Sequence, residues 1–212
     1  MALNQRCPTC AYYAVQIFST TDPLHRTLAL STLCVGTGLG GSTSMLARVS
    51  VVDSRGHVLI DTYVQPTMPV ADYRTASTGI QPESLTAGSA MNFSEVQRRV
   101  AELIRDRILV GYCLWTDLSV LGIAHPAVLT RDVGLFLPFR AALGKQKQLF
   151  GLPTLVHHLM RRRIQMRRVD SLENARASLD LYRSYQTNWE EMVSAKQWPC
   201  VLPPSTFSRC YL

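Results

Sequence analysis

The feature that most constrains the fold is a change of apolar period near Asn92. Three strands are predicted before this residue, at 27–35, 45–53 and 57–65. Glycine-rich or polar turns at 36–41 and 54–56 separate them. Short helices and buried strands then alternate. Strands followed by alternating helix and strand predict an α/β fold, with a mixed sheet and helices on its faces.

The second half of the chain supplies the predicted helices. Ser94 is a candidate N-cap for a helix whose apolar residues share one face. Further helices are predicted at 117–124, 152–160 and 172–196, and further strands at 108–112 and 128–133. Residues 66–89 and the proline-rich tail after Trp198 are predicted to be irregular. These patterns suggest a lead-in at 1–26, one domain at 27–190 and a tail at 191–212.

Composition limits the partners and the compartment. The chain is 47% apolar and carries a net charge of +7, with 22 basic and 15 acidic side chains. Such a balance favours a polyanion such as nucleic acid, although a merely basic protein has the same composition. No stretch approaches the roughly 20 apolar residues that span a bilayer, so no membrane partner is expected. Residues 1–10 lack the apolar core of a secretory signal, which indicates the nucleus or cytoplasm rather than secretion.

One segment concentrates the positive charge. Residues 161–168 read RRRIQMRR, and two lysines precede them. Arginine pairs bidentately with phosphate, so we predict nucleic-acid contacts from this group. The alternatives are a solvated helix end or a nuclear-localisation signal. The predicted contact residues are Arg161, Arg162, Arg163, Arg167, Arg168, Lys145 and Lys147.

Several segments together resemble one family. They are SMLARVSVVDSRGHVLIDTYVQP (44–66), VADYRT (70–75), GIQPESL (79–85), RILVGYCLWTDLSVL (107–121) and ENARASLDLYR (173–183). In order and spacing they resemble the DEDDh 3′–5′ exonuclease superfamily, in the RNA exonuclease 4 branch near the interferon-stimulated 20 kDa exonuclease. The resemblance covers about residues 27–185. It implies a ribonuclease-H-like fold, a five-stranded mixed sheet flanked by helices.

The resemblance also implies a two-metal phosphodiesterase site. The family holds two divalent ions with four acidic residues and uses a histidine as general base. In this chain Ser31 and Leu33 stand at the first two acidic positions, within ALSTLCVG (29–36). Asp117 keeps the third, Asn174 replaces the fourth, and Val169 replaces the histidine. One of the five catalytic side chains is therefore retained.

These substitutions predict a scaffold that has lost its catalysis. Leucine and valine offer no metal ligand or proton acceptor, and the serine and asparagine are neutral. We therefore expect no cofactor, and a pseudo-exonuclease that binds RNA, other single-stranded nucleic acid or a protein. One alternative is an active enzyme that binds magnesium or manganese through Asp117, with help from Ser31, Asn174 or Asp170. Another is a protein-interaction module without nucleic-acid binding.

Isolated residues allow further interpretations. Asp117 opens a predicted helix, so an N-cap role competes with metal ligation. Tyr112 and Trp115 could stack on bases, although packing is the simpler reading. Cys34 and Cys113 lie beside the altered motifs, where a thiolate site is conceivable but buried free thiols are common.

Two other groups could bind metal. Cys7 and Cys10 form a CxxC pair that would need Cys200 and Cys210 to complete a zinc site, so unpaired thiols are the simpler expectation. The adjacent His157 and His158 point to different faces of a helix and cannot form an i, i+4 metal pair.

Overall fold

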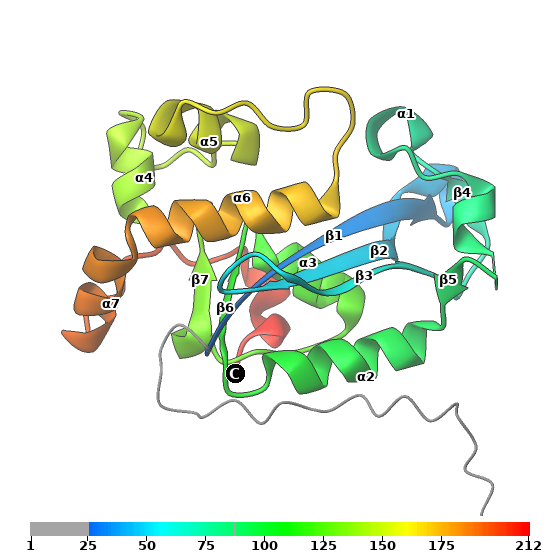
Figure 1. Ribbon diagram of the computed structural model, residues 1–212, viewed down its shortest axis with the longest axis horizontal. Coiled ribbons are helices and arrows are strands. Elements are labelled where there is room, and N and C mark those ends of the chain that lie inside the picture. Colours follow the sequence, from blue (N-terminus) through cyan, green and yellow to red (C-terminus); the bar gives the residue numbers. More distant parts are fainter. Residues whose placement is uncertain (1–25, 87) are drawn as a thin grey trace, which may run out of the picture.

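The computed structural model describes residues 26–86 and 88–212 and places seven strands in one sheet (Figure 1). The strand order is β5-β3-β2-β1-β6-β7, and β4 pairs with β1. The strands are β1 (Thr27–Thr37), β2 (Thr43–Asp53), β3 (Val58–Val64), β4 (Val70–Asp72), β5 (Ala90–Met91), β6 (Ile108–Gly111) and β7 (Thr130–Asp132). The expected mixed sheet flanked by helices is confirmed.

The strand count differs from the expected five because β4 and β5 were not predicted. The predicted meander is present, since β1, β2 and β3 pair antiparallel, while β6 and β7 continue the sheet in parallel. The short strand β4 pairs with β1 only near Gly36 and Thr37, and β5 pairs with the end of β3. Strands of two or three residues are too short to show an alternating pattern.

The helices cover both faces of the sheet. They are α1 (Thr75–Thr78), α2 (Phe93–Ile104), α3 (Leu114–Leu121), α4 (Leu137–Ala142), α5 (Leu152–Met160), α6 (Ser171–Ser184) and α7 (Gln186–Ser194). Short 3₁₀ helices occur at Leu39–Gly41, Pro82–Leu85, Ala127–Leu129 and Ser205–Cys210.

Several predicted helix ends are wrong for identifiable reasons. Asn92, not Ser94, caps α2, because its Oδ1 accepts from the Ser94 amide at 2.9 Å. The predicted helix at 172–196 divides at Tyr185 into α6 and α7. The helix α4 was not predicted; it is six residues long and begins next to Pro138.

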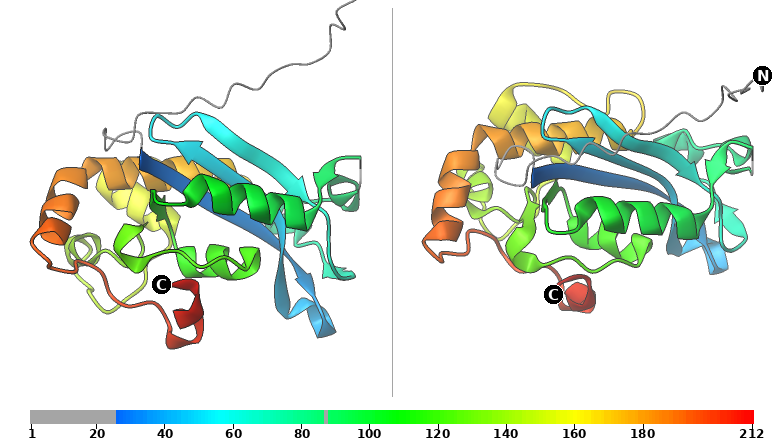
Figure 2. Two further views of the ribbon diagram at one scale, coloured as in Figure 1. Left: turned by 90° about the horizontal axis from the view of Figure 1, so that it is seen from below. Right: turned by 60° about the horizontal axis from the view of Figure 1, so that its bottom comes forward.

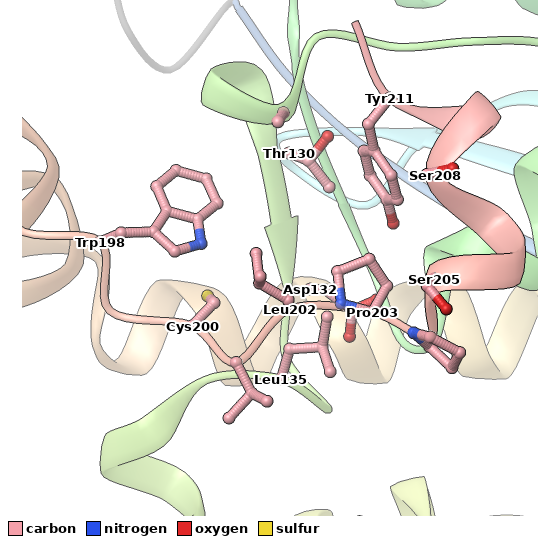
Figure 3. Close-up of a pocket in the computed structure, with 13 residues that line it drawn as sticks. Thr130, Asp132, Leu135, Trp198, Cys200, Leu202, Pro203, Ser205, Ser208 and Tyr211 are labelled. Carbon is pink, nitrogen blue, oxygen red and sulfur yellow. The ribbon is translucent and has the colours of Figure 1, made fainter.

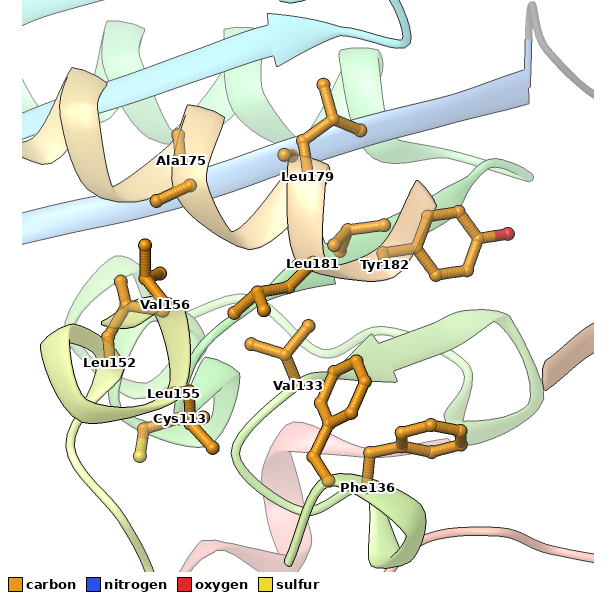
Figure 4. Close-up of a cluster of buried hydrophobic side chains, with 14 of the residues drawn as sticks. Cys113, Val133, Phe136, Leu152, Leu155, Val156, Ala175, Leu179, Leu181 and Tyr182 are labelled. Atoms are coloured by element: carbon orange, nitrogen blue, oxygen red, sulfur yellow. The ribbon is translucent and has the colours of Figure 1, made fainter. Parts of the chain in front are cut away.

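Two apolar cores hold these layers together. Leu28 and Leu30 of β1 face the core beneath α2 and α3, and Figure 2 shows α2 running along this face of the sheet. Ala29 faces the opposite core, beneath α5 and α6. Figure 4 shows Leu155, Leu181 and Phe136 converging in this second core. Alternate residues of β1 therefore enter different cores, which fixes the register of the central strand.

The C-terminal segment packs against the domain. Cys200 and Cys210 are buried, and Phe136 stacks on Trp189 of α7 with ring centroids 3.8 Å apart. Backbone bridges join Phe136 to Cys200 and His125 to Tyr211. The expectation of an irregular tail is wrong for Ser205–Cys210, where a 3₁₀ helix forms. In the part of the chain that is described, no helix has the length and apolar character needed to cross a bilayer.

Candidate functional site

Two of the family positions, Ser31 and Leu33, lie in the middle of β1. They are two residues apart and therefore on the same face of the sheet. The pairing of β1 with β6 covers Thr27 to Ala29 only, while β2 pairs along nearly all of β1. Beyond Ala29 this edge of β1 has no strand partner among the described residues until β4 pairs at Gly36, and Asp117 of α3 reaches the edge at Thr32.

The position of the family's glutamate is filled by a buried aliphatic side chain. Leu33 is 5% exposed and belongs to an apolar cluster with Val35 and Ile80. Val169, at the position of the general base, packs against the same cluster. Its amide donates to the carbonyl of Ser77 in α1 at 2.8 Å, which fixes Val169 beside that helix. Two positions that need polar atoms for hydrolysis thus belong to one apolar cluster.

The retained acid, Asp117, is turned toward β1 and is 6% exposed. Its Oδ1 accepts from the hydroxyl of Thr32 at 2.6 Å and from the Thr32 amide at 3.2 Å. Burial, with a smaller contribution from nearby Asp132, raises the pKa of Asp117 to about 8, although the hydrogen bonds from Thr32 oppose the shift. The folded chain therefore holds mostly the neutral acid at pH 7.

The predicted N-cap role of Asp117 is wrong. The helix α3 begins at Leu114, three residues earlier than expected, and Asp117 lies in its first turn. Asp132 performs the capping instead: its Oδ1 accepts from the Cys113 amide at 3.1 Å and its Oδ2 from the Leu114 amide at 2.7 Å. Asp132 lies in β7, 18 residues after Leu114. No local sequence pattern therefore indicated this contact.

The last family position lies on α6. The Oδ1 of Asn174 accepts from Nε2 of Gln165 at 2.8 Å. The neighbouring carboxylate, Asp170, caps α6 through the Glu173 amide at 2.8 Å and pairs with Nη1 of Arg48 at 2.6 Å. These bonds depress the pKa of Asp170, although its partial burial opposes them. The suggestion that Asp170 supplies a metal ligand conflicts with this double engagement.

The side chains present do not fit two divalent cations. Hard cations need several oxygen ligands, and anionic oxygens dominate such sites. At the family positions Leu33 and Val169 offer none, and the Asp117 oxygen nearest β1 is used by Thr32. Nowhere in residues 26–86 and 88–212 do three or more histidine, cysteine, aspartate or glutamate side chains form a group suited to a metal ion.

Relatives share most of this chain. RNA exonuclease 4 of Mus musculus is 38% identical over 180 residues, which cover 85% of this chain and 41% of the relative. The protein of the same name in Homo sapiens is 40% identical over 169 residues, covering 80% of this chain and 39% of the relative. The expected resemblance to the RNA exonuclease 4 branch of the DEDDh 3′–5′ exonucleases is confirmed.

The RNA exonuclease 4 proteins are longer than this exonuclease domain. RNA exonuclease 4 of Saccharomyces cerevisiae is 38% identical over 165 residues, covering 78% of this chain and 56% of the relative. The chain thus spans about two fifths of the first relatives and just over half of the yeast protein. No family model matches the chain, although these individual relatives do.

Solved structures confirm the exonuclease fold. The Saccharomyces cerevisiae PAN2 pseudoubiquitin-hydrolase-RNase module superposes with a TM-score of 0.67 at 25% identity, covering 81% of this chain and 29% of that one. The Pan2 module in complex with AAGGAA RNA gives a TM-score of 0.67 at 24% identity, covering 81% and 30%.

The basic residues of the exonuclease domain divide between separate surfaces. Lys145 and Lys147 line a hollow in the loop between α4 and α5. Arg162 and Arg163 line another hollow, beside α6. Arg168 lies against Gly79, since a Cβ at that glycine would meet Arg168 Cδ at 2.8 Å. The remaining two, Arg161 and Arg167, are exposed. The predicted residues thus line different hollows, and their contact with nucleic acid stays a prediction.

The aromatic and thiol side chains near the site serve packing. Trp115 is 5% exposed, and the Tyr112 hydroxyl donates to the Phe150 carbonyl at 3.0 Å. Burial raises the pKa of the Cys34 thiol to about 11 and that of Cys113 to about 12, so both are protonated at neutral pH.

The proposed terminal zinc site cannot be assembled from the described residues. Cys7 and Cys10 lie outside them, and Cys200 and Cys210 are buried free thiols. His157 and His158 are exposed near the end of α5, with ring centroids 5.6 Å apart and planes nearly perpendicular.

An apolar hollow of about 380 Å³ lies between β7 and the C-terminal segment (Figure 3). Trp198, Leu202 and Tyr211 line it, and Asp132 reaches its floor. None of the five family positions lines this hollow, so it is separate from the exonuclease site. Sequence reasoning missed it because its walls come from a tail that was expected to be irregular.

Proposed function

We propose that this exonuclease domain binds RNA without hydrolysing it. One observation carries the proposal: Leu33 and Val169, at the glutamate and general-base positions, pack in the same apolar cluster. An apolar contact at this place removes a metal ligand and a proton acceptor together.

The other two altered positions add to this deficit. Ser31 and Asn174 carry neutral oxygens, and the amide oxygen of Asn174 is engaged by Gln165. A general base contributes roughly 10²- to 10⁴-fold in rate, and valine has no atom that accepts a proton. Loss of the metal ligands removes a larger share of the stabilisation of the transition state.

RNA is the partner that the remaining features support. The chain carries a net charge of +7, and exposed arginines follow α5. The Pan2 modules of the same fold have been solved in complex with RNA. Retention of the fold with loss of the catalytic side chains suits a domain that holds RNA in place. We propose a nuclear location on the same family basis.

The experiment is an RNA-shortening assay of the purified chain with magnesium and with manganese. A labelled single strand should keep its length while the anisotropy of its label shows binding. Progressive loss of 3′ nucleotides that Asp117→Ala abolishes would defeat the proposal in favour of an active enzyme. Failure to bind RNA even at low salt would leave a protein-interaction module.

A further inference from the structure

Two adjoining hollows run along the exposed face of α6. The first is lined by Arg162, Arg163 and Arg176 and lies beside the loop that enters α6. The second is lined by Arg176, Arg55 and Arg183 and lies beside the turn between β2 and β3. Arg176 lines both hollows. We call the five arginines the α6 arginine track, and Figure 1 shows α6 with that loop at its N-terminal end.

The acidic residues along the α6 arginine track are already engaged. Asp180 pairs with Arg162 at 2.8 Å and with Arg183 at 3.9 Å. The Glu173 carboxylate accepts from the Gln165 amide at 2.8 Å, and Asp170 is held by Arg48. Asp180 thus pairs with two arginines of the track, whereas Asp170 and Glu173 bind groups outside it.

Three guanidinium groups remain available to a ligand. Within residues 26–86 and 88–212, no carboxylate forms an ion pair with Arg55, Arg163 or Arg176. Arg176 donates its Nε to the Gly56 carbonyl at 3.1 Å, which fixes its position and leaves its two Nη groups outward. All three side chains are exposed, so their charge is open to solvent.

The spacing suits an extended polyanion. Arg176 and Arg183 are seven residues apart, hence on one face of α6 and about 10 Å apart along its axis. Guanidinium groups recognise phosphate bidentately, and several in a row favour a chain of phosphates over a single anion. Asp170, which adjoins the family position Val169 in sequence, lines the first hollow, so this end of the track lies near the altered site.

We propose that the α6 arginine track binds the sugar–phosphate backbone of RNA outside the exonuclease cleft. The inference rests on the proposed function, because it names the surface through which RNA is held. No aromatic side chain lines either hollow, so bases have no stacking platform there. Recognition is through phosphates, which carry no sequence information. The track therefore binds adenine- and uracil-rich RNA equally.

The test compares two triple variants of the whole chain by fluorescence anisotropy with short labelled RNA. The track variant is Arg55→Gln, Arg163→Gln, Arg176→Gln. The control variant is Arg105→Gln, Lys196→Gln, Arg209→Gln, which makes the same charge change at exposed residues that line neither hollow. Equal melting temperatures for all three proteins establish that each variant is folded.

For the track variant we expect the slope of log affinity against log salt to fall by about 2, at about 0.7 per phosphate contact. Its affinity at ~100 mM salt should fall at least tenfold. The control should match the wild type. Equal losses in both variants, or none in the track variant, overturn the inference while leaving RNA binding in place. A wild type without salt-dependent RNA affinity overturns the proposed function itself.

A second variant tests the same surface by gain of affinity. Asp180→Asn releases Arg162 and Arg183 from their shared carboxylate. The affinity for RNA should rise severalfold, and the salt dependence should steepen by at most about 1.4 for two added phosphate contacts. Unchanged affinity and slope would contradict the proposed track.

Discussion

Thr32 directs both its hydroxyl and its amide at one oxygen of Asp117, at 2.6 and 3.2 Å. This contact bridges the gap that opens beside β1 where β6 ends. Asp117, the one acidic residue that remains at the family positions, thus binds the central strand β1. Its retention is explained by structure, without any need for catalysis.

Removing the hydroxyl should therefore cost stability. Thr32→Val leaves the buried Asp117 oxygen with one donor instead of two, and a lost buried hydrogen bond costs about 1–3 kcal/mol. The free energy of unfolding from urea titration measures the cost. Thr62→Val is the matched control, because the Thr62 hydroxyl donates only to the neighbouring Tyr63 carbonyl at 3.1 Å. Equal losses in the two variants would contradict the assigned role of Thr32.

The raised pKa of Asp117 predicts how stability depends on pH. The folded pKa is about 8, well above the usual value of about 4 for an unfolded chain. Between these values the folded chain holds the proton more strongly, so the free energy of unfolding falls as pH rises from about 4 to about 8. Asp132, raised to about 6 by burial, adds to the slope below pH 6.

The contribution of Asp117 to the pH dependence of stability can be isolated by mutation. Asp117→Asn keeps an oxygen acceptor for Thr32 but cannot ionise. The variant should lose most of the wild-type decline between pH 6 and pH 8, measured by urea unfolding at several pH values. A wild type whose stability is constant or rises across this range would refute the assignment.

Truncation of Asp132 should lower the stability of the fold, because its carboxylate caps α3. Asp132→Ala leaves the buried amides of Cys113 and Leu114 without their acceptor, and we expect a loss of about 1–3 kcal/mol or more. Asp132→Asn is the control, because it keeps one oxygen acceptor and should lose less. Hydrogen exchange at the Leu114 amide should accelerate in the alanine variant. Unchanged exchange there would show that another group caps α3.

Much of this fold was predictable from short-range patterns. The strand at 45–53 was predicted from alternating apolar and polar residues, and the helix at 152–160 was predicted with its observed bounds. The contacts that define the site were not predictable in this way. Thr32 and Asp117 are 85 residues apart, and Arg48 and Asp170 are 122 apart. Such pairs depend on how strands and helices are stacked, which local periodicity does not encode.

The sequence identified which residues occupy the family positions, but it did not predict the contacts that they make. Alignment with the family motifs identified Leu33 and Val169 as substituted, and the structure adds that they pack in one cluster. The arginine run shows the opposite outcome. Its sequence suggested one patch, but Arg168 lies against Gly79 while Arg163 joins a surface with Arg55 and Arg176.

Restoring one catalytic residue alone should be harmful. Leu33→Glu places a carboxylate in the apolar cluster, and an unpaired buried charge costs about 3–5 kcal/mol. Combining it with Ser31→Asp, Asn174→Asp and Val169→His should recover stability when manganese is added, because bound cations stabilise the folded state. Thermal melts with and without the metal measure this. Equal melting temperatures of the fourfold variant under both conditions would contradict the expectation.

The most direct test is a count of manganese ions bound by the wild-type chain, from calorimetric titration and from the magnetic coupling of paired ions by electron paramagnetic resonance. We predict no coupled pair and no tight binding in the wild type, because Leu33 and Val169 place apolar atoms where the family has a metal ligand and a general base. A coupled pair of manganese ions that disappears in Asp117→Ala would contradict the account.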